Sequence, residues 1–173
     1  MFYNSDKFYK IITDNDKKSL IELIDGFENV NDRILNLNLM IQSLCKKGKL
    51  DFVKFILSFD KYKNIFTQST FSFEYACLSG NIELVKYLLQ LDVLNINTLS
   101  ENIDGSFHRA CESGNIELVK FLLELFTCID ISYSDEIAFQ DACRSGNIEM
   151  VKYLLEIKPD IDIFAYKNEA IKN

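Results

Sequence analysis

The sequence has little of what catalysis requires. Its 173 residues include one histidine, one proline and no tryptophan. Because His108 is the only histidine, a cysteine–histidine or serine–histidine catalytic set has no second base to draw on. No glycine-rich loop of the kind that cradles phosphate is present either. These absences argue against an enzyme, and we expect no catalytic residues and no cofactor.

Positive charge is also scarce. The chain has 19 Lys and Arg against 26 Asp and Glu, a formal net charge of -7. Nucleic acids and anionic membranes need a concentrated basic surface, so neither is expected as a partner. No apolar run is long enough to cross a bilayer, and the opening MFYNSDKFYK lacks the basic-then-apolar order of a secretory signal. We therefore expect a cytoplasmic protein.

Cysteines are present, but in a pattern that argues against disulfides and metal sites. Their number is odd, and Cys45, Cys77, Cys111 and Cys143 occupy the same place in successive sequence repeats. Packed helices hold such residues roughly 8–10 Å apart, which is too far for the ligands of one zinc ion. We expect these four to fill tight helix contacts in a reducing compartment. Cys128, between repeats, is expected to be the partly exposed thiol.

The most informative feature is a phrase that occurs four times. Its copies are LCKKGKLDFVKFIL (44–57), ACLSGNIELVKYLL (76–89), ACESGNIELVKFLL (110–123) and ACRSGNIEMVKYLL (142–155). The glycine of the phrase recurs every 32 to 34 residues, at Gly48, Gly80, Gly114 and Gly146. A period of this size predicts a solenoid, in which each unit buries its apolar face only against its neighbours.

Each copy predicts two helices joined by a tight turn. In the third copy Phe107, Ala110 and Cys111 form one apolar stripe of a first helix. Gly114 supplies the left-handed residue that ends this helix, and Asn115 is suited to cap the next one. The second helix then places its Ile, Val and Leu residues on one face.

Charged residues recur on the opposite face of the second helix. The acid and the lysine stand three residues apart, a spacing that allows an ion pair on a helix. The pairs are Asp51 with Lys54, Glu83 with Lys86, Glu117 with Lys120 and Glu149 with Lys152. We interpret them as a solvated outer face rather than as a charged binding stripe.

These motifs resemble the ankyrin repeat family. The SGNIELVKYLL half carries the resemblance, and Gly105–Ala110 (GSFHRA) is the nearest match to the family's Thr-Pro-Leu-His-x-Ala opening. The openings FSFEYA (71–76) and IAFQDA (137–142) lack Thr, Pro and His. The resemblance implies an all-α ankyrin-repeat solenoid of stacked helix–turn–helix units with short or irregular β-hairpin fingers. It also implies that His108 bonds to neighbouring backbone.

A single ankyrin-repeat domain is expected over residues 1–173. Its parts would be a degraded N-terminal capping repeat (1–35), repeats at 36–68, 69–102, 103–134 and 135–158, and a partial C-terminal cap (159–173). Polar residues at both ends fit the exposed ends of a solenoid. The alternative is a chain cut from a longer array.

Positions that differ between copies mark the candidate binding surface. In the resembled family the first helices and finger tips line a groove, and the variable positions here flank the buried stripe of the first helix. The candidate partner-binding residues are Lys46, Phe71, Tyr75, Leu78, Asn97, Glu101, Asp104, Arg109, Glu112, Tyr133, Asp135, Asp141 and Arg144. Their mixed charges favour a partner with patterned charge over a polyanion.

The expected function is that of a non-enzymatic protein–protein interaction module that binds a partner protein, with the chain acting as a monomer. The phrase is also similar to ankyrin arrays of giant DNA viruses of amoebae and of some amoebal proteins. The viral resemblance implies action on a host factor in the host cytoplasm. The alternatives are a self-associating structural component and a substrate adaptor for a ubiquitin ligase.

Overall fold

The computed structural model describes residues 5–62, 70–91 and 96–162, and all regular elements in these ranges are helices. The helices are α1 (Ser5–Thr13), α2 (Lys17–Asp25), α3 (Val30–Lys46), α4 (Leu50–Leu57), α6 (Thr70–Leu78), α7 (Ile82–Leu89), α8 (Ile96–Glu101), α9 (Ile103–Ser113), α10 (Ile116–Leu125), α11 (Tyr133–Arg144) and α12 (Ile148–Ile157). The all-α prediction is therefore confirmed.

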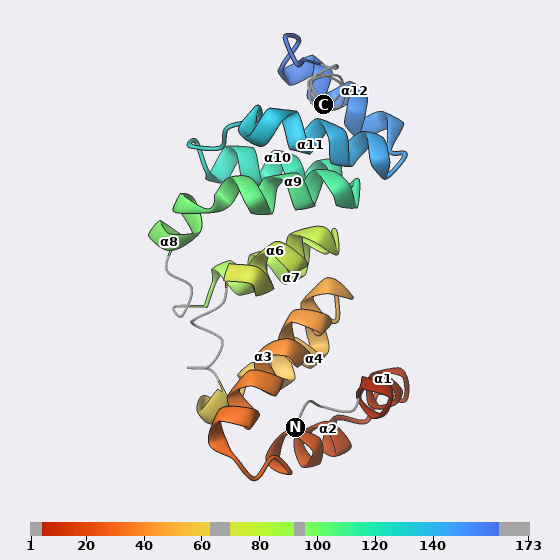
Figure 1. The fold of residues 1–173 in the computed structure, drawn as a ribbon, viewed down its shortest axis with the longest axis vertical. Coiled ribbons are helices and arrows are strands. Elements are labelled where there is room, and N and C mark those ends of the chain that lie inside the picture. The colour runs from red at the N-terminus through yellow and green to blue at the C-terminus, as the bar shows by residue number, and fades with distance from the viewer. Residues whose placement is uncertain (1–4, 63–69, 92–95, 163–173) are drawn as a thin grey trace, which may run out of the picture.

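The helices form a stack (Figure 1). The first helices α3, α6, α9 and α11 lie side by side in one row, each in contact with the next. The second helices α4, α7, α10 and α12 fold back against their own first helices and form a second layer. The pair α1–α2 lies at the N-terminal end of the stack, where α2 contacts α3. This is the solenoid that the repeat period predicts.

The turn between the two helices of each repeat is built as expected. Gly48, Gly80, Gly114 and Gly146 adopt φ values of 63, 68, 77 and 73°, in the left-handed region that favours glycine. The following asparagine then caps the second helix. In the third repeat, for example, Asn115 Oδ1 accepts a hydrogen bond from the Leu118 N–H at 3.1 Å.

The same asparagines also join neighbouring repeats. While Oδ1 caps its own helix, Nδ2 donates to the carbonyl of the glycine one repeat earlier. These bonds run from Asn81 to Gly48 at 3.0 Å, from Asn115 to Gly80 at 2.7 Å and from Asn147 to Gly114 at 3.2 Å. We call an asparagine bonded in both ways a rung. The sequence predicted the cap but not the bond between repeats.

Burial of apolar side chains also stabilises the stack. Phe107, Ala110 and Cys111 of α9 are buried, as are Leu118 and Val119 of α10, and the two preceding copies bury equivalent residues. Each buried Val, Leu or Phe side chain is worth about 1.5–3 kcal/mol. Burial also raises the pKa of the Cys45 thiol to about 12, so this cysteine is a packing residue.

The outer face carries a second contact between repeats. The ammonium of the repeated lysine lies over an aromatic ring of the following second helix. These contacts join Lys54 to Tyr87 at 5.2 Å, Lys86 to Phe121 at 5.7 Å and Lys120 to Tyr153 at 5.7 Å. The predicted ion pairs form in α7, α10 and α12. The fourth, between Asp51 and Lys54, does not form in the described part of the chain.

The ends and the connections are less regular than the repeats themselves. Cys143 was expected to be packed like the other repeat cysteines, but it is exposed, because α11 is the last first helix of the described row. Cys128 is exposed as expected. The connection before α9 contains the unexpected helix α8, and residues 126–132 are turns without a strand. Helix α3 begins before residue 36, the expected start of its repeat. Most of the expected C-terminal cap lies outside the described residues.

The rungs can be tested with two glycine variants. Gly114 and Gly146 share a left-handed φ, but an added Cβ would strike the Asn147 amide at Gly114 and meets open space at Gly146. We expect Gly146→Ala to lower the free energy of unfolding by about 1–2 kcal/mol through φ alone. Gly114→Ala should cost about 1 kcal/mol more through loss of the rung. Urea denaturation followed by circular dichroism measures both.

A double-mutant cycle supplies the control. With Asn147 replaced by alanine, the Gly114→Ala change no longer meets an amide and should cost no more than Gly146→Ala. An equal cost of Gly114→Ala in both backgrounds would show that the asparagine does not couple the two repeats.

Candidate partner-binding surface

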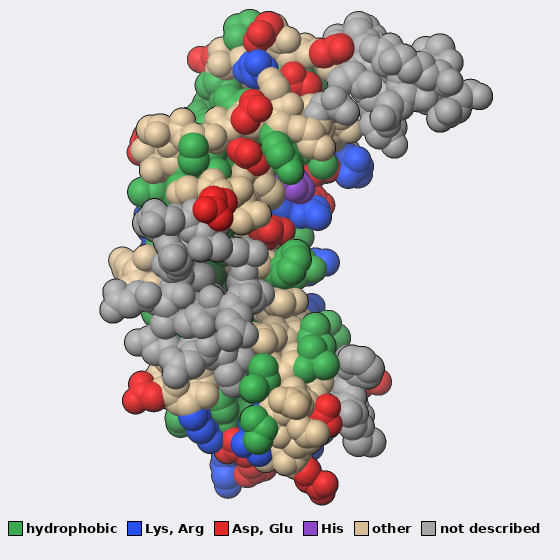
Figure 2. Space-filling view, turned by 60° about the vertical axis from the view of Figure 1, so that its left-hand side comes forward, with side chains coloured by type: hydrophobic (Ala, Val, Ile, Leu, Met, Phe, Trp, Pro, Cys, Tyr) green, Lys and Arg blue, Asp and Glu red, His purple; other side chains and the backbone are tan. Residues whose placement is uncertain are grey.

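The exposed sides of α3, α6, α9 and α11 form one continuous surface, which we call the row face. Lys46 ends α3, while α6 contributes the exposed Phe71 and the half-buried Tyr75 and Leu78. Helix α9 contributes Asp104, Arg109 and Glu112, and α11 contributes Tyr133, Asp141 and Arg144, with Glu101 from α8 beside them. The side chains of Asn97 and Asp135 lie outside the part of the chain that the structure describes. Figure 2 shows acidic, basic and hydrophobic side chains interspersed on the side it presents.

Asp141 differs from the prediction that it faces a partner. The residue is 2% exposed, and its Oδ2 lies 2.9 Å from His108 Nδ1 of the previous repeat. Its Oδ1 accepts a hydrogen bond from Arg144 Nη1 at 2.6 Å. The carboxylate is thus a structural link between α9 and α11, because both oxygens are already engaged within the chain. His108 bonds to this carboxylate rather than to the neighbouring backbone that the resemblance implied.

The arginines of the row face are neutralised locally. Arg109 Nη1 donates to Glu112 Oε2 at 2.7 Å, and both side chains are about one-third exposed, at 38% and 33%. Arg144 is held in the same way by Asp141, at 2.6 Å. Because each guanidinium is paired with an acid of its own helix, neither leaves an isolated positive charge for a partner.

An acidic cavity opens where α6, α8, α9 and α11 meet. Its volume is about 180 Å³, and its lining includes Glu74, Glu101, Asp104 and Tyr133. Burial raises the pKa of the Glu74 carboxyl, against the opposing effect of the charges on His108 and Arg109. Asp104 Oδ1 accepts a hydrogen bond from the Asp130 N–H at 2.9 Å. Glu101 and Glu74 form no ion pair among the described residues, so the cavity keeps a negative character.

A second cavity lies on the other side of α6, toward α3 and α1. It has a volume of about 190 Å³ and is lined in part by Tyr9 of α1, Lys46 of α3 and Tyr75 of α6. The Lys46 ammonium lies 5.8 Å from the centre of the Tyr75 ring. This cavity therefore combines two phenol rings with one cation, a lining unlike that of the acidic cavity.

Seven residues that line these cavities were not among the predicted ones: Tyr9, Leu39, Gln42 and Ser43 in one cavity, and Glu74, Asn102 and Gly105 in the other. Glu74 occupies the position in its repeat that His108 holds in the next, and this correspondence was the available signal. Tyr9 had no such signal, because it belongs to α1 and reaches the row face only through the packing of the N-terminal helix pair.

No group of three metal-ligating side chains forms in residues 5–62, 70–91 and 96–162. Within the same residues, no helix is both long and apolar enough to span a membrane.

A family model described as "Ankyrin repeats (3 copies)" matches residues 75–165, which is more than half of the 173 residues. The matched segment begins in α6 and contains the α9 and α11 repeats; α1 to α4 lie before it. Comparison of the chain with curated proteins finds no match.

The structural role of Asp141 leads to a stability prediction. Asp141→Ala leaves the half-buried His108 without its acceptor and should lower the free energy of unfolding by about 1.5–3 kcal/mol. Arg144→Ala removes only the pair whose arginine side chain is 69% exposed and should cost less than about 1 kcal/mol. Thermal or urea denaturation measures both. Equal effects would mean that the link to His108 contributes nothing.

Proposed function

The chain belongs to the ankyrin repeat family, whose repeats are generally protein–protein interaction modules, and we propose that it binds a partner protein through the row face. Ankyrin repeat proteins are typically binding modules without catalytic activity, and we propose that this chain has no catalytic activity either.

The observation that carries this proposal is a contrast within each repeat. The last three copies share the rung asparagine, and the stripe is apolar in all four copies, whereas the exposed places beside the stripe differ in chemistry. After the cysteine, for example, the copies have Lys46, Leu78, Glu112 and Arg144. The constant residues hold the variable ones in fixed positions before any partner arrives, so little ordering entropy is lost on binding.

The two cavities suggest how a partner is oriented. A cationic side chain fits the acidic cavity beside Glu74 and Tyr133, where carboxylates and a phenol ring both favour a cation. An apolar or acidic side chain fits the cavity between Tyr9 and Tyr75, where Lys46 supplies the charge. We therefore propose a partner that presents a basic group and an apolar or acidic group to the two sides of α6.

We also propose that the partner is a host protein. The similarity of the repeated phrase to viral ankyrin arrays supports a host factor, met in the host cytoplasm. Self-association is the second candidate. Sedimentation at several protein concentrations separates the two, since only self-association makes the sedimentation coefficient rise with concentration.

Alanine substitution of four row-face residues tests the proposed surface. The joint change of Tyr75, Leu78, Arg109 and Glu112 should remove bound partners from an affinity capture made from the native cell and read by mass spectrometry. Removal of such central contacts costs about 2 kcal/mol or more each when they are hot spots. The melting temperature should change little, because all four residues are at least partly exposed.

The matched control changes the outer face. Glu149→Ala with Lys152→Ala removes an exposed ion pair of α12 and should leave the captured proteins unchanged.

Glu74→Gln with Glu101→Gln should weaken capture only at low salt, because exposed charges are screened at high salt. A partner set that survives the four-residue change places the binding surface elsewhere.

A further inference from the structure

The joint between the N-terminal pair α1–α2 and the next pair, α3–α4, has no rung. Each rung needs an asparagine after the glycine of the turn, as at Asn81, Asn115 and Asn147. The residue after Gly48 is Lys49 instead, and its side chain makes no cap hydrogen bond to α4. The joint between α1–α2 and α3–α4 therefore lacks both bonds of a rung.

The acceptor for a rung is nevertheless in place at this joint. Asn15 stands where the later turns have glycine, and it has the same left-handed backbone, with φ 54°. Its carbonyl accepts a hydrogen bond from the Lys17 N–H at 3.2 Å, as the Gly48 carbonyl does from the Leu50 N–H at 3.0 Å. The turn at residues 12–16 is thus a copy of the later turns, and the missing part is an asparagine amide at residue 49.

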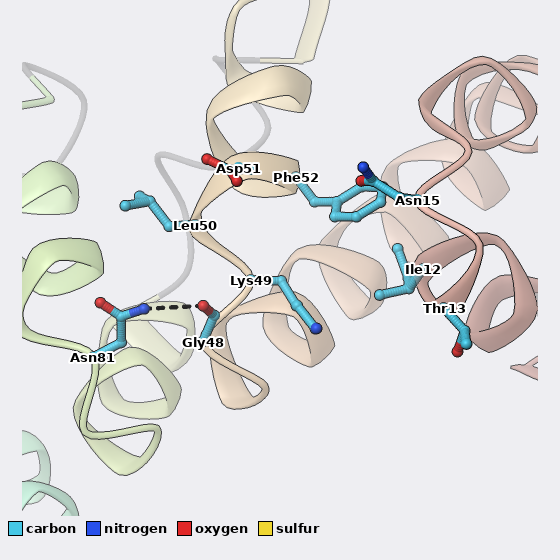
Figure 3. A pocket seen from close by; sticks show the side chains of 9 residues that line it. All are labelled: Ile12, Thr13, Asn15, Gly48, Lys49, Leu50, Asp51, Phe52 and Asn81. Carbon is cyan, nitrogen blue, oxygen red and sulfur yellow. Dashed lines mark hydrogen bonds between the residues drawn. The ribbon is translucent and has the colours of Figure 1, made fainter.

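A cavity of about 450 Å³ lies at this joint. Ile12, Thr13 and Asn15 line one side, and residues 49–52 line the other (Figure 3). The dashed line in the figure marks the intact bond from Asn81 to Gly48 at the next joint. Gly48 and Asn81 also line the cavity, so it extends from the joint without a rung up to the bridged joint.

The opposite end of the helix pair is firmly held. Asp25, the last residue of α2, accepts hydrogen bonds from Tyr62 Oη at 2.6 Å and Lys61 Nζ at 2.9 Å. These two bonds, that from Tyr62 first, hold the pKa of the Asp25 carboxyl below its ordinary value. Arg33 of α3 donates to the Phe27 carbonyl at 2.8 Å. The pair is thus tied by hydrogen bonds at residues 25–27. The turn at residues 12–16 is untied in the sense that it has no rung, although the Lys17 ammonium next to it lies 5.4 Å from the Phe55 ring centre.

Helix α1 borders the row face at the cavity that contains Lys46 and Tyr75. Tyr9 is 41% exposed and lines the cavity that contains Lys46 and Tyr75, and the Lys47 ammonium lies 4.7 Å from its ring centre. Any rotation of the pair about its tied end moves Tyr9 relative to Tyr75, because α1 leads directly into the untied turn.

From this geometry we propose that α1–α2 is a movable wall of the row face, which pivots near Asp25, opens at the turn of residues 12–16, and so sets the width of the cavity between Tyr9 and Tyr75. The pivot is independent of the proposed function, whereas its effect on a partner rests on it.

Two nearly isosteric substitutions at residue 49 test the pivot. Lys49→Asn supplies both the cap acceptor for α4 and the amide donor for the Asn15 carbonyl, whereas Lys49→Asp supplies the cap acceptor alone. Hydrogen exchange of the full chain should show amides of residues 5–25 exchanging about fivefold more slowly in Lys49→Asn than in Lys49→Asp, as expected for one added hydrogen bond. Amides of α9 to α12 should be the same in both variants.

Two results overturn the proposal. Equal exchange in the two variants would mean that the absent donor does not govern the joint. Wild-type protection of residues 5–25 as high as that of α9 and α10 would mean that the pair does not open. Both measurements use the free protein, so either failure leaves the proposed binding function untouched.

A fluorescent reporter tests the link to the row face. The chain has no tryptophan, so Tyr9→Trp places a single indole on the wall of the cavity. Acrylamide should quench this indole less in the Lys49→Asn background than in the Lys49→Asp background, because a closed joint keeps residue 9 close to Lys46 and Tyr75 in the cavity. Equal quenching, together with unequal exchange, would keep the pivot and remove its effect on the cavity.

Discussion

The structure depends on one side chain that satisfies two backbone groups in different repeats. The rung asparagine accepts from its own second helix through Oδ1 and donates to the preceding glycine carbonyl through Nδ2, as Asn115 does toward Leu118 and Gly80. A side chain of this length reaches both groups only if the two turns lie in one register. The left-handed glycine is the other half of the constraint, because its backbone aims the carbonyl at the next repeat. Spacing and alignment of the first helices follow from these local bonds.

What faces solvent is a consequence of this register. Rungs, buried stripes and lysine–aromatic contacts recur from repeat to repeat. The variable residues of each first helix therefore lie beside the variable residues of the neighbouring first helix. Two cavities of different chemistry then arise from identical scaffolding, one acidic near Glu74 and one tyrosine-lined near Lys46. Asp141 is an exception. Its position varies between the copies, yet its side chain is part of the scaffold, since one carboxylate oxygen bonds to His108 and the other to Arg144.

Sequence reasoning succeeded where the deciding forces are local. Helix spacing, the glycine turn and the asparagine cap all act within one repeat, so Phe107, Gly114 and Asn115 could be assigned their roles from the sequence alone. It failed where the outcome depends on the neighbouring repeat. Cys143 has the same local context as the buried Cys111, and only the absence of a following described helix explains its exposure. The link from His108 to Asp141 and the helix α8 likewise had no local signal.

A repeated scaffold also makes its own exceptions informative. The lysine at residue 49 changes nothing within α3 or α4 that would prevent them from packing, because Phe52 and Val53 remain buried. Its effect is confined to the joint, where residue 49 makes no cap bond and has no asparagine amide to bridge the two turns. A weak joint inside the row would separate two halves of the binding surface. Placed before α3, it frees only the helix that carries Tyr9, so the remaining row keeps its register while one wall can move.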